Sequence, residues 1–309
     1  MKRLISHEEL ARDSRFKRVR NRNSLLTDLP DDVDVIAKVL ESAGPSIRKR
    51  VEGTELESAY DEMGPGFQFL TNLAPVDKDS PAFILQLRMR LHGIFVGELQ
   101  AMEAAGRTLW DFPDAPWEFK MNMARQTWDE ARHVQIFEKL MDHVGCETGA
   151  YPESTFLFET SCADDPAFRV AGVNRCLEGL ACDVFRDLME LAKQIDDPLM
   201  RQALDYVLAD ELTHVRFGSE WVKEFVRGDE DRQQAVKEYQ REVETSFAFG
   251  GARKLARDVR REAGFTDEEM DEIESLGGKG PKRDTIRRAA ELVRDRHVAR
   301  QRGENVAAL

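Results

Sequence analysis

Apolar residues recur every three or four positions along most of this chain, and polar residues fill the positions between them. That period matches the turn of an α-helix. We find no pair of alternating apolar and polar segments joined by a short turn dipeptide, which is the usual signal of a β-hairpin. The pattern therefore predicts an all-α protein.

Start and stop signals divide the middle of the chain into four long predicted helices. Proline in the first turn favours a helix start, and glycine or an aspartate-rich break favours a helix end. The predicted helices cover residues 81–110, 116–145, 166–195 and 198–228. Short breaks join the first helix to the second and the third to the fourth, whereas a crossover over residues 146–165 separates the two pairs. This connectivity predicts a four-helix bundle with one long crossover.

Further amphipathic segments flank this bundle. Short helices are predicted over residues 31–43 and 46–63 before it. Further helices are predicted over 229–262 and 283–301 after it, with a Gly/Lys/Pro linker at 277–282 between them. We therefore expect a helical N-terminal extension (1–80), a core bundle (81–228) and a helical C-terminal extension (229–309).

Six polar residues interrupt the apolar faces of the four long helices. They are Glu98, Glu130, His133, Glu178, Glu211 and His214. Ionised carboxylates on inward faces are costly unless something compensates their charge. Two divalent cations would neutralise four glutamates, so these faces predict a metal centre.

The spacing of the six residues supports this hypothesis. Glu130 and His133 are three residues apart, as are Glu211 and His214, so each pair shares one helix face. Glu98 precedes Glu130 by 32 residues, and Glu178 precedes Glu211 by 33. Four carboxylates and two imidazoles form the ligand set of a dinuclear site in a helical bundle. Oxygen-rich ligation with one imidazole per ion favours iron or manganese over zinc. The alternative is that such pairs arise by chance on exposed helix faces.

Residues next to the six suggest supporting roles. Asp129 and Asp210 each lie four residues before a motif histidine. Metal-bound histidines usually donate their second N–H to a carboxylate, so each aspartate is predicted to bond to the histidine of the other motif. The alternative is a pair of acids on the helix surface. Four apolar neighbours are predicted to line a substrate pocket and exclude water, or else to serve in plain core packing: Phe95, Met102, Phe137 and Phe185.

Composition excludes several classes of protein. No apolar stretch reaches the 18 residues of a membrane span, and the N-terminus has no apolar signal-peptide region. Four cysteines without a C-x-x-C pair are typical of reduced thiols, so we expect a cytoplasmic protein. The net charge is −13, but residues 1–22 carry +5, residues 281–309 carry +4 and the remainder carries −22. The acidic body disfavours nucleic acid, whereas the basic ends could bind it or pack on a partner subunit.

The six residues together resemble the ligand set of the ferritin-like di-iron carboxylate superfamily, over about residues 81–227. The segment from Ala252-Arg253 through Ala263-Gly264-Phe265 also resembles the C-terminal extension of a bacterial group of ferritin-like proteins. The resemblance implies two iron ions, or manganese, that activate O2 with electrons from an external donor. Superfamily reactions are hydroxylation, desaturation, N-oxygenation and oxidation of iron itself.

Fold does not choose among these reactions, but some features narrow them. The resemblance puts Phe137 where radical-generating relatives have tyrosine, which disfavours a tyrosyl radical. Extensions at both ends favour an oxidase or oxygenase of a small organic metabolite, and we expect a homodimer. The alternatives are a tRNA-modifying hydroxylase that uses the basic ends, an iron- or manganese-handling (ferroxidase or storage) protein, and a metal-free helical scaffold.

Overall fold

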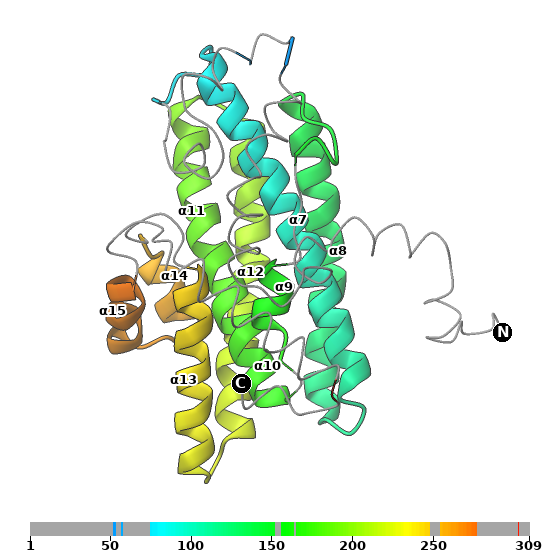
Figure 1. Ribbon diagram of the computed structural model, residues 1–309, viewed down its shortest axis with the longest axis vertical. Helices are drawn as coiled ribbons and strands as arrows, with labels where there is room; N and C mark the ends of the chain where they lie inside the picture. Colours follow the sequence, from blue (N-terminus) through cyan, green and yellow to red (C-terminus); the bar gives the residue numbers. More distant parts are fainter. Residues whose placement is uncertain are drawn as a thin grey trace, which may run out of the picture.

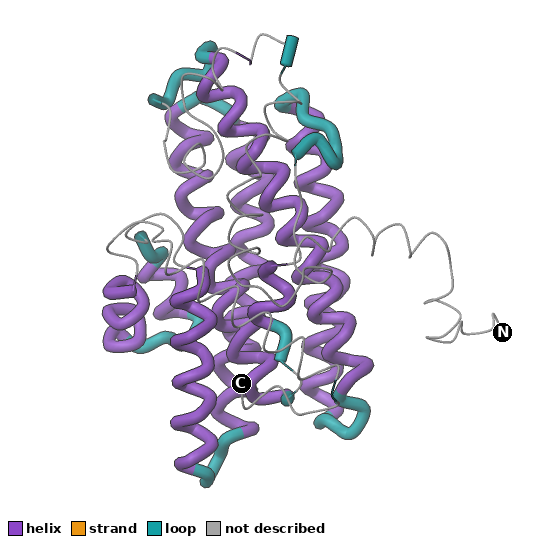
Figure 2. Tube along the Cα trace, in the orientation of Figure 1, coloured by secondary structure: helices purple, strands orange, loops and turns teal. Residues whose placement is uncertain are grey.

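The computed structural model describes residues 75–151, 156–163, 165–247 and 254–276, together with Glu52, Gly53, Glu57 and Arg302. Within these residues the protein is helical and contains no strand (Figures 1 and 2), which confirms the all-α prediction. No helix in this part of the chain is both long and apolar enough to cross a bilayer. The helices expected over 31–43 and 283–301, and almost all of that over 46–63, lie outside the described residues.

Four long spans form the bundle: α7 (Pro81–Asp111), α8 (Trp117–His143), a composite third span and α12 (Pro198–Phe225). The third span consists of α10 (Pro166–Val170), the π-helical segment η1 (Ala171–Leu177) and α11 (Glu178–Gln194). The aspartates before the prolines cap the last two spans, because Asp165 accepts hydrogen bonds from the N–H groups of Ala167 and Phe168, and Asp197 from that of Met200. In Figure 1, α8 and α11 run in the same direction, as do α7 and α12.

That arrangement requires a connection along the length of the bundle between α8 and α10. The predicted crossover makes it, but it is not plain loop, because it includes the short helix α9 (Phe156–Ser161). The third span also differs from a regular helix, since η1 has a wider turn than an α-helix. The residues of η1 are all buried. They have the bundle on one side and α13 (Glu230–Phe247) on the other, so both sides of this segment are covered.

The C-terminal part departs from the prediction of one helix over 229–262. Helix α13 ends at Phe247, the residues Lys254–Ala256 are not helical, and α14 (Arg257–Glu262) follows them. A further helix, α15 (Asp267–Leu276), was not predicted. Figure 1 shows α13 beside the lower half of the bundle with α14 and α15 on its flank. The predicted boundaries at 80 and 228 stay predictions.

Two buried arginines attach this C-terminal part to the third span. Arg260 of α14 donates from Nε and an Nη to the two oxygens of Asp183, at 2.9 and 2.6 Å. Arg175 of η1 donates to Gln240, Ser219 and Glu269. Both guanidinium groups lie over the ring of Phe265, at 4.0 Å for Arg175 and 5.0 Å for Arg260. A shift of α13–α15 would separate these buried charges from their partners at a large cost in free energy, so the network fixes how the three helices pack.

Close backbone approach at Gly172 leads to a stability prediction. A Cβ at Gly172 would lie 2.1 Å from the carbonyl oxygen of Ser161, so Gly172→Ala forces η1 and α9 apart. We expect a loss of about 2–4 kcal/mol in the free energy of unfolding. A Cβ at Gly93 of α7 meets nothing within 4 Å, so Gly93→Ala is the matched control and should stabilise by about 0.5–1 kcal/mol. Urea titrations of both variants test this, and equal stabilities would contradict the packing described.

Candidate metal centre

The bundle brings the six predicted ligands together at one level. Glu98 comes from α7, Glu130 and His133 from α8, Glu178 from the start of α11, and Glu211 and His214 from α12. They form two groups, within each of which the ligand atoms lie within 4.8 Å of one another. The first group is Glu98, Glu130, His133 and Glu211, and the second is Glu130, Glu178, Glu211 and His214. None of the six residues is more than 5% exposed.

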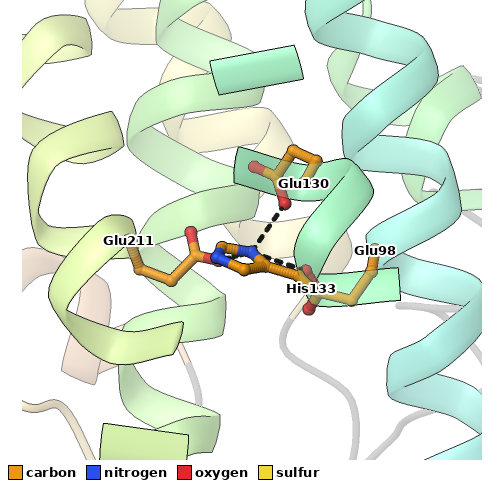
Figure 3. Close-up of side chains that lie close together, drawn as sticks. All are labelled: Glu98, Glu130, His133 and Glu211. Atoms are coloured by element: carbon orange, nitrogen blue, oxygen red, sulfur yellow. Dashed lines mark hydrogen bonds and ion pairs between the residues drawn. The ribbon is translucent and has the colours of Figure 1, made fainter. Parts of the chain in front are cut away.

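The first group surrounds the imidazole of His133, as Figure 3 shows. Its Nδ1 atom lies 3.3 Å from Glu98 Oε2, 3.0 Å from Glu130 Oε2 and 3.2 Å from Glu211 Oε1. Carboxylates from three different helices therefore converge on one nitrogen atom.

The second group places two of its carboxylates beside the imidazole of His214. Its Nδ1 atom lies 3.1 Å from Glu130 Oε1 and 3.3 Å from Glu211 Oε2. The centroids of the two imidazole rings are 5.9 Å apart. Glu130 and Glu211 thus turn one oxygen toward each histidine, and both glutamates belong to both groups.

The two aspartates lie where the sequence predicted them. Asp210 Oδ2 is 3.3 Å from His133 Nε2, and Asp129 Oδ2 is 3.3 Å from His214 Nε2, so each aspartate faces the histidine of the other motif. Arg132 joins them by donating to both carboxylates. An Nε2–H that donates to a carboxylate leaves Nδ1 with its lone pair toward the glutamates, which is the tautomer that a metal needs.

Sequence reasoning missed two buried amides at the same level. Gln126 Nε2 donates to Glu178 Oε1 at 2.7 Å and to Glu130 Oε1 at 3.3 Å. Asn174 donates to Gln126 Oε1 at 2.7 Å. Gln126 and Asn174 each lie four residues before a ligand glutamate, which puts them on the ligand face of their helices. That spacing is the signal that could have found them.

The predicted pocket residues differ in burial. Phe95, Phe137 and Phe185 are buried in the largest hydrophobic cluster, and the rings of Phe137 and Phe185 stack with their centroids 5.5 Å apart. Met102 is only half-buried. Along α8, Phe137 follows His133 by one turn and Gln126 precedes Glu130 by one turn, so the centre has an apolar side and a side with amide groups.

The buried glutamates and histidines of the centre differ in the direction in which their pKa values are shifted. Burial raises the pKa of Glu98 and of Glu178 well above the ordinary value, and nearby carboxylates raise both further. Burial also acts to raise the pKa of Glu130, but the two histidines outweigh it and the net shift is downward. Burial opposes the charged form of His133 and His214, yet the surrounding carboxylates raise the pKa of both. Without cations, protons compensate the carboxylates.

The donor set fits divalent cations. Glu211 Oε1 is a buried oxygen that makes no hydrogen bond, and it lies 3.2 Å from Nδ1 of His133 in the first group. A buried carboxylate oxygen without a hydrogen bond is costly, and a cation beside it would remove that cost. Four carboxylates and two imidazoles are ligands that iron and manganese accept.

An all-helical bundle with a buried cluster of glutamates and histidines defines the class of protein, and this cluster fits metal binding. Residues 78–271 match the family described as "Protein of unknown function (DUF455)", which has the ferritin-like fold. The chain belongs to this family. Comparisons with curated proteins and with solved structures give no match.

Proposed function

We propose that this protein binds two iron ions, with manganese as the alternative, and is an O2-activating oxidase or oxygenase of a small organic metabolite. The observation that carries the proposal is the pair of overlapping ligand groups that share Glu130 and Glu211. One ion would take Glu98 and His133, and the other would take Glu178 and His214. A bound iron pair supplies the electrons and the Lewis acidity for reaction with O2.

The side chains around the ligands have separate tasks. Asp210 and Asp129 orient His133 and His214. Gln126 holds Glu178 through its amide, whereas the aromatic pair Phe137 and Phe185 excludes water from the opposite side. Exclusion of water favours oxidation of an organic molecule, because water would compete for the reacting group. Hydroxylation, desaturation and N-oxygenation all remain within the proposal, and the electrons would come from an external donor.

The test is anaerobic loading with Fe(II) followed by exposure to O2. An oxidase or oxygenase should oxidise about two Fe(II) per chain and then stop until a reductant is supplied. A Glu98→Ala/Glu211→Ala double variant, which removes two ligands from the first group and one from the second, should oxidise none at this centre. Equal oxidation by the double variant would end the proposal.

The burial of the ligands favours a second candidate, a ferroxidase or manganese-handling protein without an organic substrate. Ligands at most 5% exposed admit ions and O2 more easily than a metabolite. This candidate predicts continuous oxidation of added Fe(II) and iron accumulation beyond two per chain in a large oligomer. The tRNA-hydroxylase alternative depends on residues 1–22 and 281–309, which lie outside the described residues except for Arg302.

Metal affinity should depend steeply on pH. Glu98, Glu178, His133 and His214 all have raised pKa values, so they hold protons that a cation must displace. Loading should release up to four protons per chain, and affinity should fall as pH drops from about 8 to about 6. Calorimetric titrations in buffers of different ionisation enthalpy measure the release. Binding heats that do not depend on the buffer would contradict this protonation pattern.

A further inference from the structure

The outward face of α8 carries a stripe of apolar side chains, which we call the α8 stripe. It consists of Trp117, Met121, Ala124 and Trp128. Both tryptophans are 67% exposed and Met121 is 50% exposed. The buried residues of this helix, among them Gln126, Glu130 and His133, lie on the opposite face. The stripe therefore adds nothing to the core, and exposed tryptophans at helical spacing are typical of an interface.

The spacing of the α8 stripe is the same in both directions along the helix. Four residues separate Trp117 from Met121, three separate Met121 from Ala124, and four separate Ala124 from Trp128. A two-fold axis between positions 122 and 123 would therefore place Trp117 of one chain opposite Trp128 of another. The same axis would place Met121 opposite Ala124, so that a long side chain meets a short one. Two-fold interfaces require such self-complementarity.

Charges beside the stripe agree with the same axis. Glu118 and Arg125 flank the stripe on one side of α8, and both are exposed. In an antiparallel pair this side of one helix meets the same side of the other. Glu118 of one chain then comes within about one helical turn of Arg125 of the other, which is within reach of an arginine side chain. Opposite charges at such flanking positions favour antiparallel pairing.

We propose that a second copy of this chain binds to the α8 stripe, with the two α8 helices antiparallel about an axis between positions 122 and 123. Large aromatic side chains bury about 150–250 Å² each, and a specific interface buries about 800 Å² per partner. The two tryptophans and Met121 thus supply much of the area that such a dimer needs. The stripe lies on the face of α8 opposite the predicted ligands, whereas the flanking Arg125 also donates a hydrogen bond to Asp129.

The first test is sedimentation equilibrium of the full chain. Wild type should sediment at twice the 35.3 kDa chain mass. Met121→Arg puts a charge at the centre of the stripe and should weaken the dimer on the order of 100-fold. Leu199→Arg is the matched control, since Leu199 is 54% exposed on α12 away from the stripe, and it should remain dimeric. Circular dichroism verifies that both variants fold.

The second test determines how the two α8 helices are aligned along each other in the dimer. Met121→Cys protein is mixed with Ala124→Cys protein and oxidised. The disulfide between the two different variants should form in preference to a disulfide between two copies of one variant. Wild type is the blank, because its four cysteines are buried. A monomeric wild type overturns the proposal. This includes a monomer in which a segment of the same chain covers the stripe and protects the fluorescence of its tryptophans from an added quencher. A Met121→Arg variant that stays dimeric overturns it as well, and so does a larger oligomer or no preference for the mixed disulfide.

Discussion

Glu211→Ala should abolish metal binding at both proposed positions, whereas Glu98→Ala should abolish it at one. Glu211 belongs to both ligand groups, but Glu98 belongs only to the group around His133. Loss of a shared carboxylate takes a ligand from each ion and leaves each with too few donors in a buried site. Each variant is titrated with Fe(II) under anaerobic conditions and passed through gel filtration. Elemental analysis then gives the number of iron ions retained per chain.

Glu220→Ala is the control for this comparison, because Glu220 is an exposed glutamate on the same helix, and it should retain both ions. Circular dichroism shows whether each variant folds. If Glu98→Ala and Glu211→Ala lose the same number of ions, Glu211 is not shared. The two groups would then not form one dinuclear centre.

Arg260→Met should be the most destabilising single substitution outside the metal centre. Arg260 is fully buried, and its guanidinium binds both oxygens of Asp183, which is itself 5% exposed. Removal of the arginine takes two charged hydrogen bonds from a buried carboxylate, which also accepts a hydrogen bond from the N–H of Ala256 at Oδ1. Breaking a buried pair in this way costs about 3–5 kcal/mol. Urea titration monitored by circular dichroism measures the loss.

The neighbouring position supplies the control for Arg260→Met. Arg261 pairs with Asp267 on the surface, with a side chain that is 55% exposed, and Arg261→Met should cost less than about 1 kcal/mol. A double Arg260→Met/Asp183→Leu variant should recover part of the loss, because it also removes the buried carboxylate that has lost its arginine. Equal effects at positions 260 and 261 would show that α14 does not anchor the C-terminal part.

The six candidate ligands could be identified from sequence, because charged residues rarely occur on buried helix faces and these six follow the period of a helix. Glu98 and Glu211 sit in apolar stripes where a carboxylate has no reason to be unless something compensates it. The four long helices were predictable for a related reason, since proline and capping aspartates mark where three of them begin. Local signals of this kind are sufficient to predict a helix when that helix is long and amphipathic.

The remaining features of the site and the fold depend on contacts between segments that are distant in the sequence. Gln126 and Asn174 are neutral, so only their position four residues before a candidate ligand glutamate sets them apart, and the sequence does not show which groups they bond to. The π-helical turn of η1 and the pairing of Arg260 with Asp183 depend on how α13–α15 pack against the third span, and no local pattern encodes that packing. The short helix α15 has too few turns for its period to be distinctive.

The most direct test of the dinuclear centre is the iron content of protein purified from iron-rich medium, combined with Mössbauer spectroscopy of the same sample. The shared carboxylates predict about two irons per chain, magnetically coupled to each other. Protein without bound metal, or with a single uncoupled iron that survives in the Glu211→Ala variant, would contradict the account.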